Sequence, residues 1–161
     1  MPDKDITREV LRMFTYGLFV AASTGPDGPC AATISWVTQA SFEPRLISVA
    51  LRKGTAICDT VRANRRFALQ LVGSDQADFA KTFFKVSRPS AEEIAGYHFT
   101  LQGTGVPVFD AALAWLECEV VEEAGRDGDH TLFIATVLSS GIQAPNAVPL
   151  ALRGTPWHYG G

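Results

Sequence analysis

Two dense clusters of turn residues, each set between short runs of apolar and β-branched residues, constrain the fold of this chain most strongly. Residues 25–29 separate the run 18–23 from a run that opens at Cys30, and residues 125–129 precede the longest run, 130–139. Short strands joined by tight turns pair as antiparallel hairpins. About seven such strands with two or three short helices predict a mainly β fold, an antiparallel, Greek-key-like barrel.

The composition fits a single globular domain over residues 1–161. Of these residues, 47% are hydrophobic and 19% are charged, which is sufficient for one core. The net charge of −3 argues against a broad nucleic-acid-binding surface, which needs clustered cations. No stretch is apolar and long enough to cross a bilayer and no signal region opens the chain, so a cytoplasmic protein without membrane contact is expected.

The three cysteines, Cys30, Cys58 and Cys118, are widely spaced in apolar surroundings. An odd number without a CxxC pattern favours neither a disulfide framework nor a metal site, and no three metal-ligating residues have ligand spacing. We expect reduced core residues; the alternative, a catalytic thiol, has no supporting pattern.

Helical spacing is seen in four short segments. Ile6, Val10, Leu11 and Phe14 fall on one side of a first helix. Further helices are predicted over residues 55–64, 77–83 and 91–95, the last one capped by residues 88–90. Residues 36–44 are interpreted as a polar loop, Gly141 as the end of a strand, and the tail as carrying a last short strand. Residues 87–105 are interpreted as an insertion, which we expect to lie over a pocket or at a subunit contact.

The stretch from Cys30 to Thr55 has the clearest functional pattern, namely strand, polar loop, strand and helix start. Arg52 and Lys53 are followed by Gly54 and the capping residue Thr55, and a helix N-terminus with nearby cations suits a phosphate. The hydroxyl groups of Thr33, Ser35, Thr38 and Ser41 can hold a polar ring system beside it. The stretch therefore predicts a site for a phosphorylated cofactor. The alternative is an ordinary helix cap beside solvated cations.

Several segments resemble the flavin reductase-like family, which has the FMN-binding split-barrel fold. They are residues 32–44, 46–51, 53–55, 64–68 and 128–133, and the resemblance extends from the first helix to Tyr159. It implies a split barrel of six or seven strands that forms a homodimer, with flavin near the dimer contact. Two departures affect the expected nicotinamide contacts more than the flavin contacts: residues 25–30 lack an asparagine common in relatives, and the C-terminal tail differs. Trp36, in place of a smaller aromatic residue, can reshape access to the flavin ring.

The resemblance also implies roles for individual residues. Those along the flavin ring and ribityl chain are Thr33, Ser35, Trp36, Val37, Thr38, Gln39, Ala40 and Ser41; those near the phosphate are Ala50, Lys53, Gly54 and Thr55. A segment that closes over the flavin contains Phe79, Lys81, Thr82 and Phe83, although phenylalanines at this spacing are also typical of a core. Tyr159 belongs to a tail, residues 157–159, that borders the nicotinamide.

A bound flavin accepts hydride at N5, so the protein needs to supply orientation and a hydrogen-bond donor rather than an acid–base triad. His130 is the candidate catalytic residue, as a donor to flavin or a support for nicotinamide; the alternative is an exposed hairpin histidine. These features favour an NAD(P)H-dependent flavin reductase using FMN, or FAD, that supplies a monooxygenase. The alternatives are an FMN-binding electron carrier without a nicotinamide site, working with a rubredoxin-like partner, and a structural barrel without flavin. Nothing in the sequence distinguishes NADH from NADPH.

Overall fold

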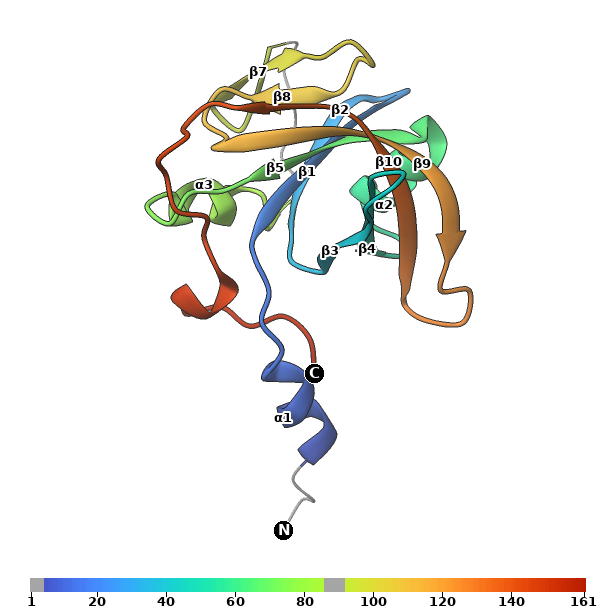
Figure 1. The fold of residues 1–161 in the computed structure, drawn as a ribbon, viewed down its shortest axis with the longest axis vertical. Helices are drawn as coiled ribbons and strands as arrows, with labels where there is room; N and C mark the ends of the chain where they lie inside the picture. The colour runs from blue at the N-terminus through green and yellow to red at the C-terminus, as the bar shows by residue number, and fades with distance from the viewer. Residues whose placement is uncertain (1–4, 86–91) are drawn as a thin grey trace.

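The computed structural model describes residues 5–85 and 92–161, and its centre is one antiparallel sheet of seven strands. The strand order is β2-β1-β5-β9-β10-β4-β3, so β2 and β3 are the two edges and the curved sheet does not close (Figure 1). The predicted mainly β, antiparallel architecture is confirmed. The strands are β1 Phe19–Gly25, β2 Gly28–Ile34, β3 Val37–Ser41, β4 Leu46–Arg52, β5 Arg66–Leu71, β9 Ala114–Ala124 and β10 His130–Ile142.

Both predicted turns are present. Gly25 pairs with Gly28 across the β1–β2 hairpin, and Gly28 has a φ of +102°, which favours glycine. Gly125 opens the β9–β10 turn with a φ of +85°, and a Cβ atom there would lie 2.8 Å from the His130 carbonyl oxygen. The turn residues therefore fix the register of the two hairpins.

Strand β3 corrects the interpretation of residues 36–44 as a loop. Residues 37–41 pair with β4, with an irregularity between Gln39 and Ser41, and only residues 42–45 form a turn. Because β3 is an edge strand whose three middle residues are exposed, neither of its faces produces an apolar alternation in the sequence. The pattern that identifies a half-buried strand is therefore missing.

Strand β10 corrects a second prediction, because it continues through Gly141 to Ile142. Gly141 pairs with Trp115 on β9, and a Cβ atom at Gly141 would lie 2.6 Å from the indole. The glycine makes room for the indole rather than ending the strand. The predicted last strand of the tail is also wrong: the described tail has two isolated bridges, Gly17 to Ala151 and Gly73 to Pro149, and a short 3-10 helix, Leu152–Gly154.

Two predicted helices pack on the sheet. In α2, Ala56–Asn64, the buried residues are Ile57, Cys58 and Val61, and the Thr55 hydroxyl accepts a hydrogen bond from the Cys58 N–H at 3.4 Å. Helix α3, Ala77–Thr82, buries Phe79 and Ala80. Two apolar clusters form the main core, one around Phe79, Phe83 and Phe109 and the other around Val49, Phe67 and Phe133. Cys58 and Cys118 are buried, as predicted, whereas Cys30 is only half-buried.

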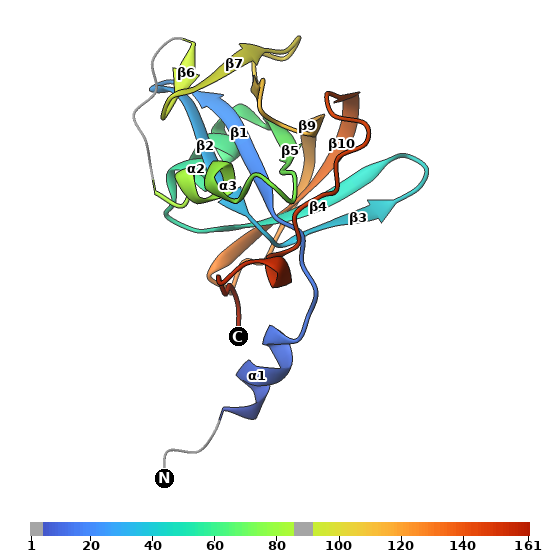
Figure 2. The ribbon, with the colours of Figure 1, turned by 90° about the vertical axis from the view of Figure 1, so that its left-hand side faces the viewer.

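A second sheet lies at the end of the molecule opposite to the N-terminus (Figures 1 and 2). It contains β6 Glu93–Ile94, β7 Tyr97–Leu101 and β8 Pro107–Phe109. The helix predicted at residues 91–95 is wrong for the described part, which starts with β6; its predicted cap at residues 88–90 lies outside the described residues. Thr104 is bound to the buried carboxylate of Glu117 on β9 through its N–H and its hydroxyl group, which ties this sheet to the main one.

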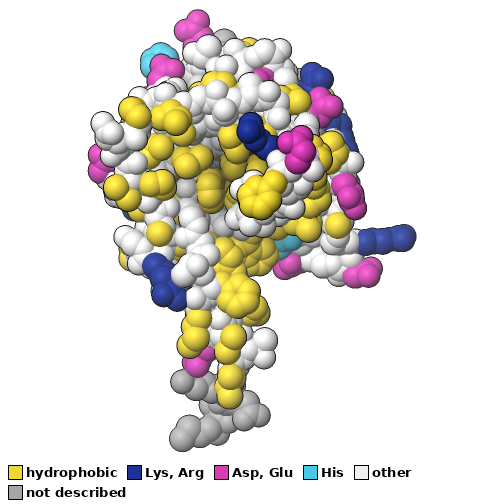
Figure 3. Space-filling model, in the orientation of Figure 1, with side chains coloured by type: hydrophobic (Ala, Val, Ile, Leu, Met, Phe, Trp, Pro, Cys, Tyr) yellow, Lys and Arg dark blue, Asp and Glu magenta, His cyan; other side chains and the backbone are white. Residues whose placement is uncertain are grey.

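Helix α1, Ile6–Arg12, projects away from the sheet (Figure 1), and none of its residues is buried. The side chains of its predicted apolar side are exposed in the described part of the chain, and yellow side chains follow the projecting helix in the space-filling view (Figure 3). Among the described residues, no helix has the length and apolar character needed to span a membrane.

Candidate functional site

A cavity of about 370 Å³ opens between β2, the end of β4, the start of α2, the residues after α3 and the C-terminal tail. These elements come from distant parts of the sequence. Three of them, β2, β4 and the start of α2, belong to the stretch from Cys30 to Thr55 or follow it directly, as the sequence predicted. Six of the predicted cofactor-binding residues line it: Thr33, Ser35, Ala50, Thr55, Phe83 and Tyr159.

The hydroxyl groups of Thr33 and Ser35 differ in their partners. The Thr33 hydroxyl donates to the Ala80 carbonyl oxygen at 2.5 Å and the Thr33 N–H donates to the Phe83 carbonyl oxygen at 3.1 Å, so β2 is fastened to α3. The Ser35 hydroxyl is buried and has no hydrogen-bond partner among the described residues. Because a buried polar atom without a partner is costly, Ser35 is suited to a polar ligand atom in this cavity.

The structure does not bring all the predicted residues into the cavity wall. Trp36 and the residues of β3, namely Val37, Thr38, Gln39, Ala40 and Ser41, follow Ser35 away from the lining along the sheet edge. In α3, Phe79 is core, Lys81 is exposed and the Thr82 hydroxyl donates to the Asp78 carbonyl oxygen within the helix. Their roles toward a ligand stay predictions.

Lys53 and Arg52 lie on different sides of the end of β4. The Lys53 ammonium group donates to the carbonyl oxygens of Gly125, Arg126 and Gly128 at 2.8, 2.8 and 2.5 Å, outside the cavity lining. Arg52 lines the cavity instead, as expected from the alternation of side chains along a strand. Gly54, between Lys53 and Thr55, has a φ of +76° and does not line the cavity.

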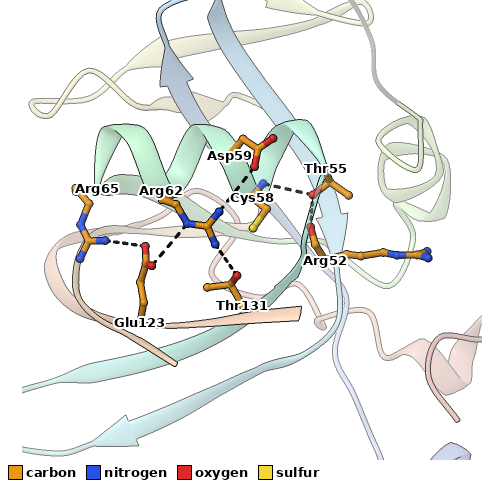
Figure 4. A network of polar contacts seen from close by, with 8 residues as sticks. All are labelled: Arg52, Thr55, Cys58, Asp59, Arg62, Arg65, Glu123 and Thr131. Carbon is orange, nitrogen blue, oxygen red and sulfur yellow. Dashed lines mark hydrogen bonds and ion pairs between the residues drawn. The ribbon is translucent and has the colours of Figure 1, made fainter. Parts of the chain in front are cut away.

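Helix α2 is held in place by Arg62, which lies among Asp59, Glu123 and Thr131 (Figure 4). Its guanidinium donates to the buried Thr131 hydroxyl on β10 at 2.7 Å. The Arg52 side chain extends away from this cluster (Figure 4). The cluster thus anchors the last turn of α2 to β9 and β10, whereas at the start of α2 the Thr55 hydroxyl donates to the Arg52 carbonyl oxygen at 2.7 Å.

His130 does not line the cavity, but it contacts Tyr159, which does. Its Nδ1 lies 2.7 Å from Asp129 Oδ1 and its Nε2 lies 2.7 Å from the Tyr159 hydroxyl, while its ring packs on Trp36 at 4.4 Å. The hydrogen bond with His130 lowers the pKa of Asp129, and burial raises the pKa of Tyr159. A carboxylate, an imidazole and a phenol therefore form one hydrogen-bonded chain that ends at the cavity wall.

Other lining residues are only partly foreseen by the sequence. Arg52, Trp157 and His158 belong to the segments expected near the phosphate and the nicotinamide, and the position of Lys85 allows it to face either solvent or a ligand. Phe84 also lines the cavity, although the sequence does not identify it as a site residue. Among the described residues, no group of three His, Cys, Asp or Glu side chains has the arrangement of a metal site.

The sequence model of a protein family, the flavin reductase like domain, matches residues 11–154 of this chain. The chain is 30% identical over 158 residues to NADH-dependent flavin reductase StyB of Pseudomonas fluorescens, with 97% of this chain and 89% of that protein covered. It is 32% identical over 160 residues to the reductase component of a 4-nitrophenol 4-monooxygenase/4-nitrocatechol 2-monooxygenase of Rhodococcus opacus. That match covers 98% of this chain and 82% of the other protein.

The coverage of other relatives and of solved structures defines the extent of the likeness. The chain spans 25% of the length of a diflavin flavoprotein of Nostoc, to which it is 28% identical over 146 residues. The structure of the styrene monooxygenase flavin reductase from Pseudomonas putida S12 superposes with a TM-score of 0.77 at 29% identity, covering 98% of this chain and 97% of that one. The predicted split-barrel fold is thereby confirmed. Since the family model covers most of its length, the chain belongs to the flavin reductase-like family.

Proposed function

We propose that the protein is an NAD(P)H-dependent flavin reductase that passes hydride from reduced nicotinamide to FMN or FAD. Two relatives covered over more than four-fifths of their length are named as an NADH-dependent flavin reductase and as the reductase component of a monooxygenase. The observation that carries the proposal is the cavity of about 370 Å³, formed by segments within the family match together with the tail.

The cavity residues fit a flavin. The buried, unpaired Ser35 hydroxyl is suited to a polar atom of the ring, and the apolar residues of β2 and Phe83 are suited to its faces. The cations for a phosphate are Arg52 and Lys85, beside the N-terminus of the nine-residue helix α2. A bound flavin supplies the hydride acceptor; the protein supplies its orientation and the exclusion of water.

The chain Asp129–His130–Tyr159 supports a positioning role for His130. With Asp129 bound to Nδ1, the imidazole is held in one orientation against Trp36 and presents Nε2 to the Tyr159 hydroxyl. Tyr159 transmits this arrangement to the cavity wall, where Trp157 and His158 also lie. We infer that these residues border the nicotinamide.

A monooxygenase is the proposed partner, because relatives are named as reductase components of monooxygenases. A homodimer is also proposed, since the apolar side chains of α1 are exposed in the structure of residues 5–85 and 92–161. A cytoplasmic location stays a prediction.

The second candidate function is an FMN-binding electron carrier that works with a redox partner. It is favoured by the likeness to a diflavin flavoprotein, of which this chain matches only one quarter. One anaerobic experiment separates the two functions: purified protein is mixed with NADH or NADPH and excess FMN, and absorbance is followed at 340 nm for nicotinamide and near 450 nm for flavin. Catalytic nicotinamide oxidation supports the reductase. Tight flavin binding without turnover supports the carrier, and the absence of both contradicts a flavin function.

A further inference from the structure

The C-terminal tail runs along the cavity wall and reaches α1. Its residues 157–159 line the cavity, and the next residue, Gly160, contacts both Trp36 and Arg12. Both ribbon views place the end of the tail beside α1 (Figures 1 and 2). Residues 157–161 are called the C-terminal strap below. The strap connects the cavity to a helix that does not itself line it.

Gly160 fits closely between these two contacts. A Cβ atom at Gly160 would lie 3.2 Å from Trp36 Cζ2, and its φ of +98° is one that residues with a side chain rarely adopt. Arg12 Nε of α1 donates to the Gly160 carbonyl oxygen at 3.2 Å. The position therefore requires glycine, and a charge-assisted hydrogen bond from α1 holds it in place.

The indole N–H of Trp36 is buried and has no hydrogen-bond partner among the described residues. It lies beside the strap, because a Cβ atom at Gly160 would be 3.6 Å from Trp36 Nε1. A buried N–H without a partner is costly, since it has given up its hydrogen bond to water. Movement of the strap away from Trp36 lets water reach this N–H, so the closed position carries a cost that opening removes.

The end of the strap is held by contacts that water can reach. One is the hydrogen bond from Arg12, and another joins the Tyr159 hydroxyl to His130 Nε2 at 2.7 Å; both are exposed. The chain before the strap is fixed by its backbone instead, since the Leu152 N–H donates to the Tyr16 carbonyl oxygen at 2.9 Å. The end of the strap can therefore open while the chain before it stays in place.

We propose that the C-terminal strap opens and closes the cavity, and that Arg12 is a positioning residue that holds it closed through Gly160. In the closed position the Tyr159 ring lies 6.0 Å from that of His130 and 5.2 Å from that of Trp36, and it forms part of the cavity wall. Closure thus slows the release of a molecule from the cavity. That this molecule is FMN rests on the proposed function, whereas the opening of the strap does not.

The test measures solvent exchange of the Trp36 indole N–H by NMR, in the full isotope-labelled chain without flavin and with the signal assigned by Trp36→Phe. Arg12→Met keeps the aliphatic stem but has no donor, and Arg12→Lys keeps a charged donor. Gly160→Ala places a Cβ atom against Trp36. Arg45→Met, at an exposed arginine of the β3–β4 turn, is the matched control.

We expect Arg12→Met to raise the exchange rate of the Trp36 indole about tenfold, because one charge-assisted hydrogen bond no longer opposes opening. Gly160→Ala should raise the rate as well, Arg12→Lys should recover part of the wild-type protection, and Arg45→Met should leave the rate unchanged. The release of bound FMN after dilution, followed by flavin fluorescence, should accelerate by a similar factor in Arg12→Met.

An unchanged indole exchange rate in Arg12→Met overturns the proposal. So does an increase that the backbone N–H groups of the central strand β5 share, since that is a general loss of stability. If indole exchange accelerates but FMN release does not, the strap does not control the cavity and the proposal fails. A wild-type protein that binds no FMN contradicts the proposed function, while indole exchange still tests the strap.

Discussion

Arg52 and Lys53 are consecutive cations, yet their side chains serve different parts of the molecule. The Lys53 ammonium group donates hydrogen bonds to three carbonyl oxygens of the β9–β10 turn, whereas Arg52 lines the cavity. We expect Arg52→Gln to raise the Kd for FMN about tenfold while leaving riboflavin within twofold, because only FMN has the phosphate. Titration of intrinsic and flavin fluorescence measures both.

Lys53→Gln is the matched comparison. Loss of the ammonium leaves the turn carbonyls without their donor, so we expect a lower thermal midpoint and an equal, small effect on FMN and riboflavin. A selective loss of FMN in Lys53→Gln, with Arg52→Gln unaffected, would instead place the phosphate at Lys53, as the sequence pattern alone suggested.

His130 is the residue whose catalytic role is most open to direct test. We expect His130→Ala to reduce the single-turnover rate of flavin reduction by about 10²-fold, the size of a positioning effect, with flavin Kd changed less than threefold. Stopped-flow absorbance under anaerobic conditions measures the rate. His98→Ala, at an exposed position on β7, is the control and should retain the wild-type rate; an unchanged rate in His130→Ala removes His130 from the mechanism.

At the scale of residues, the sequence predicted which segments form the cavity better than it predicted what each side chain contacts. Ser35 and Thr55 could be placed at the site because they belong to a strand end and a helix cap, which are local patterns. The side on which Lys53 lies could not be predicted, since it depends on the turn that β9 and β10 form some 70 residues later. Phe84 reaches the cavity through the tertiary packing of the segment after α3, and this packing has no local signal in the sequence.

At the scale of elements, buried strands were predictable and the edge strand was not. Strands β1, β4 and β5 show apolar runs because their residues face the two core clusters. Strand β3 is exposed over its middle residues and so resembles a loop. Strand β10 continues through Gly141 because the Trp115 side chain of β9 fills the space beside this glycine. This is a contact between two strands, so the sequence around Gly141 alone does not reveal it.

Glu117 joins three elements and makes their stability dependent on pH. Burial alone would raise its pKa, but hydrogen bonds from Ser139 and Thr104 outweigh burial and hold the pKa of Glu117 below its ordinary value. A lowered pKa in the folded state stabilises the protein above the unfolded-state pKa of about 4.3, and this contribution is lost as pH falls through the folded-state pKa.

We therefore expect Glu117→Gln to reduce the free energy of unfolding by about 1.5–3 kcal/mol at pH 7, the typical value for hydrogen bonds to a charged group. The difference from wild type should shrink as the pH falls from 5 to 3, since the wild-type carboxylate then becomes protonated as well. Urea unfolding at each pH measures it. Glu122→Gln, at an exposed position on the same strand, is the control, and a difference that does not vary with pH contradicts this account.

At the scale of the whole molecule, α1 is a helix without a buried residue in the described part of the chain. It has seven residues, and Ile6 and Met13 are 68% and 64% exposed. Isolated helices of this length are marginal in water, because nucleation costs more than a few hydrogen bonds return. The hydrogen bond from Arg12 Nε to the Gly160 carbonyl oxygen connects α1 to the tail, and packing of its apolar side against a second surface would stabilise it further. A second copy of the chain provides such a surface without requiring any other protein, and burying this side contributes to association.

The proposed dimer makes a specific prediction for the apolar side of α1. Ile6 and Val10 lie four residues apart on one side, so Ile6→Glu combined with Val10→Glu places two charges in the contact. We expect the wild-type protein to sediment with twice the mass of the chain and the double variant with the mass of one chain at micromolar concentration. Leu101→Glu, a 53% exposed residue of β7, should leave the dimer intact, because β7 lies at the opposite end of the molecule (Figure 1). If the wild type is a monomer, or if the double variant still dimerises, α1 is not the contact and its apolar side needs a different partner.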